Sequence, residues 1–198
     1  MTEEDIWAKI KRLRISDMSL LAPVVRSRVG LSLKIAEHEV LDVTVKGQRY
    51  SVPMKAYVVE TLRVQELQEI YYGQKTSKVK NVLYGSHAYG VAVDIVSVQY
   101  GWFTGAAAVK AWPDKDVRNT ISVLWFKRLA DIVTADKVMA WGGLWKKFPD
   151  SPHFQSARTP VSPNDAMRQA YAAAGGGEAG RKAVWAMFGL DASATMLA

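Results

Sequence analysis

One carboxylate in an otherwise apolar stretch constrains this chain more than any other feature. Residues 91–96 read Val-Ala-Val-Asp-Ile-Val, a β-forming run that only Asp94 interrupts. Since side chains alternate between the two faces of a strand, Asp94 shares its face with Ala92 and Val96. Burial of a carboxylate is unfavourable unless a positive group accompanies it. The sequence therefore predicts a buried strand with a polar site on one face, where the small side chain of Ala92 leaves room.

A histidine precedes this strand, and a second candidate segment lies far downstream. His87 lies seven residues before Asp94, and Gly90 permits the bend that would bring both to one side. Asp150 and His153 stand three residues apart in Phe-Pro-Asp-Ser-Pro-His-Phe, where the prolines exclude a helix. Two imidazoles, a carboxylate and an open position suit a catalytic zinc, and the second carboxylate could handle protons. Taken alone, the two segments also fit an ordinary ion pair beside a surface histidine and a proline-rich loop over an aromatic core.

The remaining periodicity predicts an α+β fold, a single domain with a small antiparallel sheet flanked by helices, followed by a helical extension. Residues 1–158 would form this domain, and residues 159–198 the extension, which we expect to pack on the core. Helical periodicity covers residues 3–13, 19–39, 64–72, 116–135, 164–174 and 181–188. Strand-like patterns cover residues 41–59, with a turn at 46–48 and an interruption at Pro53, as well as 91–98 and 153–155. The Trp-Gly-Gly segment at residues 141–143 is expected to be a loop.

Composition excludes several kinds of site and leaves the meaning of the charge open. The chain of 198 residues contains no cysteine, so disulfides, cysteine-ligated zinc and thiol catalysis are excluded. Its net charge of +7 fits either a solvated surface or a polyanionic partner. No zinc-finger, RNP or recognition-helix pattern accompanies the charge, so nucleic acid is not expected as a partner. No apolar run has the length of a signal peptide or a membrane span, and we therefore expect a protein made in the cytoplasm.

Three blocks of sequence resemble, in order, the family of zinc D-Ala-D-Ala carboxypeptidases and L-alanyl-D-glutamate endopeptidases. Residues 60–68 resemble the family's E-T-x-R-x-x-x-x-Q block, and residues 87–94 match H-x-x-G-x-A-x-D at every fixed position. Residues 141–154 are similar to the W-G-G-x-W-x-x-F-x-D-x-P-H-F ending of phage endopeptidases. The resemblance runs from about residue 18 to residue 156 and implies a fold like that of the D,D-peptidases and Hedgehog domains.

The resemblance also implies chemistry. His87, Asp94 and His153 would bind one zinc ion, and Asp150 would be the catalytic base that activates the zinc-bound water. The activity would be that of a phage or prophage endolysin, hydrolysing the L-Ala–D-Glu bond of the peptidoglycan stem peptide after a holin releases it from the host cytoplasm. Two alternatives remain: a D,D-carboxypeptidase on the same fold, and a non-catalytic virion or cell-wall-binding protein.

Four further side chains are candidate substrate contacts. Arg63 would bind a substrate carboxylate or steady the developing oxyanion, although a surface ion pair at a helix start would also explain it. Gln68 would support the site, and Trp141 would supply an apolar wall. The family usually places a serine two residues before the first zinc histidine. Here Gly85 holds that position and Ser86 is adjacent, so Ser86 is the candidate hydroxyl.

Two parts of the chain depart from the matched pattern or lie outside it. Ala140 stands where phage members often carry a glutamate. The cell-wall carboxypeptidases use a glutamate as base in a related segment, so its absence here favours the endopeptidase with Asp150 as its base. The extension combines basic and aromatic residues, so it fits either a cationic tail that contacts an anionic outer envelope or two helices docked on the core. We expect a monomer whose partner is bacterial peptidoglycan.

Overall fold

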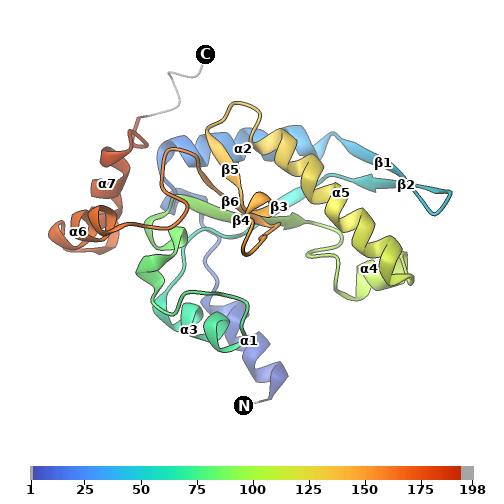
Figure 1. Ribbon diagram of the computed structural model, residues 1–198, viewed down its shortest axis with the longest axis horizontal. Coiled ribbons are helices and arrows are strands. Elements are labelled where there is room, and N and C mark those ends of the chain that lie inside the picture. Colours follow the sequence, from blue (N-terminus) through green and yellow to red (C-terminus); the bar gives the residue numbers. More distant parts are fainter. Residues whose placement is uncertain (1, 193–198) are drawn as a thin grey trace.

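The computed structural model describes residues 2–192, so Met1 and residues 193–198 of the predicted extension lie outside the described part. It contains a four-stranded antiparallel sheet, a separate two-stranded hairpin and helices around both (Figure 1). In spatial order the sheet consists of β3 (Ala56–Glu60), β4 (Ala92–Ser97), β6 (His153–Ser156) and β5 (Met139–Trp141). The hairpin consists of β1 (Val40–Val45) and β2 (Gln48–Pro53). The predicted α+β class is confirmed.

Seven α-helices lie in the described part of the chain. They are α1 (Glu3–Leu13), α2 (Pro23–Glu37), α3 (Gln65–Gly73), α4 (Ala106–Ala111), α5 (Lys115–Val133), α6 (Asp165–Ala173) and α7 (Gly177–Met187). Four short 3-10 turns accompany them: η1 (Met18–Leu20), η2 (Val82–Tyr84), η3 (Ser86–Tyr89) and η4 (Gly142–Leu144). No helix of residues 2–192 is long and apolar enough to cross a membrane.

Several element boundaries differ from the sequence prediction for identifiable reasons. Helix α2 begins at Pro23 rather than at residue 19, because the fixed φ of proline suits the first helical turn. Trp141 ends β5 instead of opening a loop, since it pairs with Phe154 of β6. Helix α4 was not predicted, because its Ala-rich six residues carry no apolar periodicity. Helix α7 begins at Gly177, four residues before the predicted start at residue 181, because the segment Gly-Glu-Ala-Gly at residues 177–180 is helical and not part of the break between the two helices.

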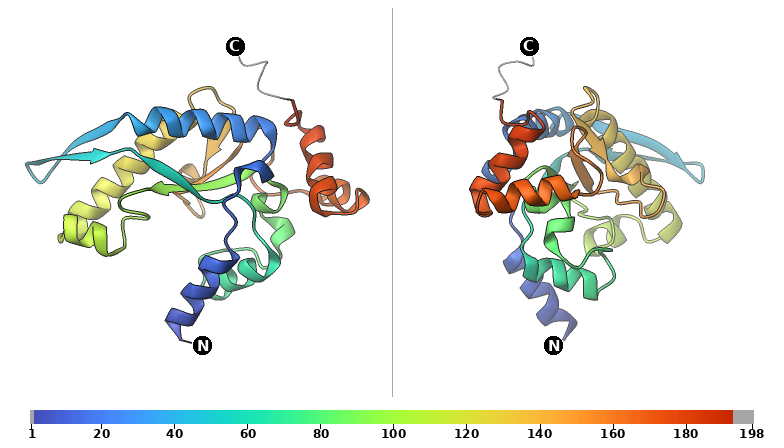
Figure 2. Two further views of the ribbon diagram at one scale, coloured as in Figure 1. Left: turned by 180° about the vertical axis from the view of Figure 1, so that it is seen from behind. Right: turned by 60° about the vertical axis from the view of Figure 1, so that its left-hand side comes forward.

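The two faces of the four-stranded sheet have different surroundings. Val93 and Ile95 of β4 are fully buried in a core that also contains Val25 of α2 and Leu129 of α5. Helices α2 and α5 pack against each other along this side of the molecule, and Figure 2 shows α2 running the length of the sheet. Asp94 alternates with these apolar residues and therefore faces the other way. That second face carries the polar site.

The C-terminal helices contact the part of the molecule that supports His87. The indole nitrogen of Trp185 in α7 donates to the carbonyl of Tyr89 in η3 at 2.7 Å. Leu190 is fully buried in the core, and its carbonyl accepts from the backbone N–H of Val24 at 3.3 Å. Residues 177–190 are thus docked on the rest of the structure. Contact of this extension with an anionic envelope stays a prediction.

Candidate active site

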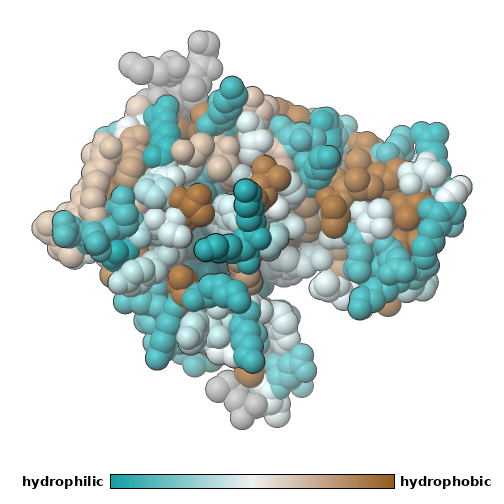
Figure 3. All heavy atoms as spheres, viewed as in Figure 1, coloured by the Kyte–Doolittle hydropathy of each residue, from teal (hydrophilic) through white to brown (hydrophobic). Residues whose placement is uncertain are grey.

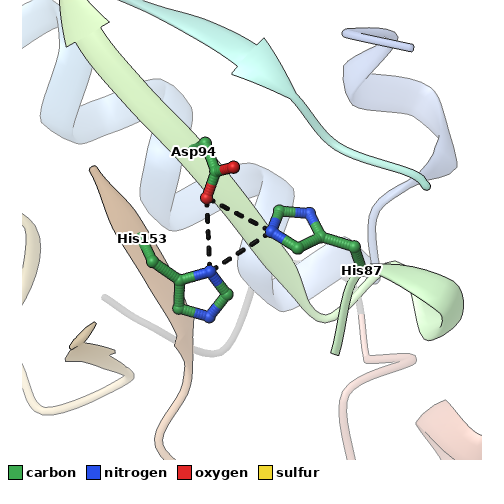
Figure 4. Close-up of side chains that lie close together, drawn as sticks. All are labelled: His87, Asp94 and His153. Carbon is green, nitrogen blue, oxygen red and sulfur yellow. Dashed lines mark hydrogen bonds and ion pairs between the residues drawn. The ribbon is translucent and has the colours of Figure 1, made fainter. Parts of the chain in front are cut away.

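Strand register places the acidic and imidazole side chains side by side. Asp94 of β4 pairs directly with His153 of β6 on one side and with Glu60 of β3 on the other. Directly opposite residues on neighbouring strands share a face and bring their side chains close together. Three polar side chains therefore form a row across the sheet, and Figure 4 shows Asp94 and His153 projecting toward each other.

His87 reaches the same point from a turn rather than from a strand. It lies in η3, and Gly90 follows with φ +65°, in the left-handed region that glycine adopts readily. A Cβ on Gly90 would lie 2.3 Å from the carbonyl oxygen of Leu20, so the backbone approach also requires glycine. The bend expected between His87 and Asp94 is present, and it aims the imidazole at the strand (Figure 4).

The three candidate ligand atoms form an almost equilateral triangle. His87 Nε2, Asp94 Oδ1 and His153 Nδ1 lie 3.2 Å apart in each of the three pairs. Ligands about 2.0–2.1 Å from a tetrahedral zinc are separated by roughly 3.3 Å, so the triangle matches one face of such a tetrahedron. The residues present therefore fit a divalent metal, with the fourth position open for chemistry.

A hydrogen-bond chain fixes the tautomer of His153. The side-chain amide of Gln155 donates from Nε2 to the carbonyl of Pro160 at 3.0 Å, which leaves its Oε1 facing His153 Nε2 at 3.2 Å. Ser86 Oγ also donates to this oxygen at 2.9 Å. His153 Nε2 must then carry a proton, and in the neutral ring Nδ1 presents a lone pair to Asp94. Two facing acceptors require a positive charge between them, which a cation or a second proton can supply.

We expect the substitution Gln155→Met to weaken metal binding about 10- to 100-fold, because partners that orient ligating histidines typically have effects of this size. The buried Nε2–H of His153 would lose its acceptor, and the imidazole could rotate away from the ligand triangle. Zinc affinity of the metal-free protein, measured by competition with a chromogenic chelator, checks this. Ser86→Ala is the matched control, since it removes one hydrogen bond from Gln155 and leaves His153 bonded; equal affinities for all three proteins would contradict the role of Gln155.

Arg63 holds the second oxygen of Asp94. Its Nη2 donates to Asp94 Oδ2 at 3.4 Å, Nη1 donates to Gln68 Oε1 at 3.3 Å, and Nε is paired with Glu60 Oε1. The side chain is only 14% exposed, so the alternative of a surface ion pair does not describe it. Burial opposes the charge of Arg63, but Glu60 and Asp94 raise its pKa nonetheless. Arg63 thus positions the candidate carboxylate ligand, and its contact with substrate stays a prediction.

The titration of the site follows from its burial and its charges. Burial alone would raise the pKa of Asp94, but the His87 imidazole and hydrogen bonds from both histidines hold this pKa well below its ordinary value. Burial lowers the pKa of His153, but the hydrogen bond and charge of Asp94 outweigh it and raise this pKa. Asp94 is thus ionised and ready to bind a cation. A metal would compete with a proton for His153 Nδ1.

The loop between β5 and β6 brings Asp150 to the same cleft. A Cβ on Gly142 would meet the carbonyl oxygen of Asp150 at 2.8 Å, and the Asp150 N–H donates to the Gly142 carbonyl at 3.0 Å, so glycine permits this close packing. Trp141 Nε1 fixes the far end of the loop by donating to Ser151 O at 2.7 Å. Burial first, and then the charge of Asp94, raise the pKa of Asp150. A raised pKa suits a carboxylate that accepts a proton near neutral pH.

The candidate residues gather around one cleft of about 720 Å³. Figure 3 shows the molecule hollowed between the lobe of α1 and α3 and the lobe of α4 and α5. All three candidate ligands line the cleft, together with Asp150, Arg63 and Ser86. Gln68 and Trp141 are not among the lining side chains within residues 2–192, and both instead hold neighbouring groups in place.

Comparison with known proteins agrees with the motifs. Residues 80–156, the segment that contains all three candidate ligands and Asp150, match a family model described as D-alanyl-D-alanine carboxypeptidase. This segment is therefore similar to that peptidase family, in agreement with the resemblance of the motifs. The crystal structure of the Serratia marcescens L-Ala D-Glu endopeptidase ChiX is similar, with 22% identity and a TM-score of 0.41 over 74% of this chain and 92% of that one. A search of curated protein sequences gave no match.

Proposed function

We propose that this protein is a zinc-dependent peptidoglycan endopeptidase that hydrolyses the L-Ala–D-Glu bond of the stem peptide. The observation that carries the proposal is the triangle of His87 Nε2, Asp94 Oδ1 and His153 Nδ1, with Asp150 lining the same cleft. The family match over residues 80–156 supports peptidase chemistry at this site. The ending of residues 141–154, which is similar to that of phage endopeptidases, favours the endopeptidase over other members.

Each residue around the cleft has a separate task in this proposal. A zinc ion held by the three ligands would acidify a water molecule and polarise the scissile amide carbonyl. Asp150 accepts the proton of the attacking water and returns it to the leaving amine. Arg63 holds the second oxygen of Asp94 in place. The aromatic ring of Trp145, with its centroid 4.9 Å from that of His153, forms part of the cleft wall beside this ligand.

The biological setting is part of the same proposal. An enzyme of this kind would be made in the host cytoplasm as a phage or prophage endolysin, and it would reach the cell wall after holin release. The description of the matched family, D-alanyl-D-alanine carboxypeptidase, makes a D,D-carboxypeptidase the second candidate. A non-catalytic wall-binding protein is the third.

Digestion of purified sacculi distinguishes these functions. We expect the wild-type protein to lower the turbidity of the suspension and to release peptides with a new D-Glu N-terminus, as identified by mass spectrometry. A chelator should abolish this activity, and added zinc should restore it. Release of terminal D-Ala without loss of turbidity would support the carboxypeptidase instead. Binding without any released product would leave only the wall-binding protein.

A further inference from the structure

Arg14 lies in the cleft away from the metal ligands and is held rigidly on two sides. It follows the last residue of α1, and its Nε donates to the hydroxyl of Tyr71 at 3.0 Å. Its guanidinium carbon lies 4.7 Å from the ring centroid of Trp102, within the range of a cation–π contact. Both Arg14 and Trp102 line the cleft. The side chain is thus pre-organised before any ligand binds.

The two arginines of the cleft differ in what their guanidinium groups contact. Arg63 uses all three of its nitrogens on Glu60, Gln68 and Asp94. Arg14 uses only Nε, and within residues 2–192 its two Nη atoms make no hydrogen bond or ion pair. A planar guanidinium with a free Nη edge matches the two oxygens of a carboxylate.

Tyr71 connects this arginine to the metal centre. Its hydroxyl accepts from Arg14 and donates to Glu60 Oε2 at 3.1 Å, and Glu60 in turn holds Arg63. Burial and the charge of Glu60 raise the pKa of Tyr71 to about 12, so the phenol stays neutral and keeps both hydrogen bonds. Arg14 therefore has a fixed position relative to the reacting groups.

We propose that Arg14, with Tyr71 and Trp102, forms a subsite for a carboxylate of the peptide substrate at a distance from the amide that is cut. The inference rests on the proposed function, because it assumes a peptide whose reacting amide lies at the metal centre. Trp7, which is 45% exposed and lies seven residues before Arg14 on α1, extends the same wall of the cleft. Stem peptides carry several carboxylates, so this subsite would select among them by position.

The test compares acetylated L-Ala-γ-D-Glu-L-Lys-D-Ala with two versions in which the D-Glu α-carboxylate or the C-terminal carboxylate is amidated. Because the D-Glu α-carboxylate adjoins the scissile amide, the C-terminal amide is the one that we expect to lower kcat/KM of the wild-type protein about 10- to 100-fold, the size of a lost charged hydrogen-bond pair. Arg14→Gln should lose this preference, and Arg14→Lys should keep part of it. Lys78→Gln is the matched control, because Lys78 lies on the same cleft but is exposed. The preference is the ratio of kcat/KM for the free acid to kcat/KM for the amide, measured with the same protein. A smaller folded fraction lowers both values equally and leaves this ratio unchanged.

Binding separates failure of the subsite from failure of the proposed function. Titration calorimetry of the same three peptides against the Asp150→Asn protein reports binding without hydrolysis, and the Arg14→Gln/Asp150→Asn double variant should bind the free acid about 10- to 100-fold more weakly. If no peptide or sacculus is cut but this difference appears, the proposed reaction is wrong and the subsite stands. Three outcomes would show that the subsite is wrong. Arg14→Gln could keep the wild-type preference, it could weaken the binding of all three peptides equally, or the wild-type protein could show no preference among the peptides.

Discussion

Replacement of Asp150 by asparagine is expected to lower kcat by about 10²- to 10⁴-fold while the protein keeps its metal, since positioned acid–base groups contribute rate factors of this size. Asparagine preserves the shape of the side chain but cannot accept a proton. The backbone N–H and carbonyl of residue 150 carry the contacts that position the loop, and both survive the substitution. The substitution is therefore expected to impair catalysis while the loop keeps its backbone contacts.

The measurement combines peptide hydrolysis with zinc content by mass spectrometry after dialysis. Asp131→Asn is a suitable control, because it makes the same exchange on the exposed side of α5, away from the cleft. Both variants should retain one zinc per chain, and only Asp150→Asn should lose activity. Wild-type turnover by the Asp150 variant would show that another group accepts the proton.

Local sequence pattern predicted those parts of the site that depend on short-range rules. A carboxylate on a β-forming run, a glycine before it and two prolines around Asp150 each restrict the backbone within a few residues. These restrictions sufficed to expect a bend after His87 and a short strand at His153. The structure contains both, in η3 with Gly90 and in β6.

The groups that orient the ligands could not be predicted in the same way, because tertiary pairing creates their roles. Glu60 faces Asp94 only through the register of β3 and β4, and its sequence context shows no more than a charged residue three positions before Arg63. Gln155 offered one usable signal, since it lies two residues after His153 and so shares its strand face. Its partner Pro160 and the cleft contact of Arg14 with Trp102 depend on loops that carry no periodic pattern.

Substitution of Asp94 by asparagine should remove the metal, and activity should fall with it. The Asp150→Asn protein, in contrast, should lose activity but keep its metal. Asp94 supplies the only negative charge among the three candidate ligands, and its neutral amide replacement would leave two imidazoles as the remaining ligands. We expect zinc affinity to fall by more than the roughly 10- to 100-fold effect of an outer partner such as Gln155. Arg63 would also lose its carboxylate acceptor at 3.4 Å and keep only Glu60 and Gln68.

The two variants remove the same charge from the same cleft, so their comparison isolates what each carboxylate does. Zinc content and chelator competition on Asp94→Asn, set beside Asp150→Asn, should give a metal-free protein in the first case and a metal-loaded inactive one in the second. Excess zinc should restore part of the activity of Asp94→Asn, because His87 and His153 still converge, and should restore none to Asp150→Asn. An Asp94→Asn protein that holds zinc as tightly as the wild type would mean that the 3.2 Å triangle is an imidazole–carboxylate hydrogen-bond cluster and not a metal centre.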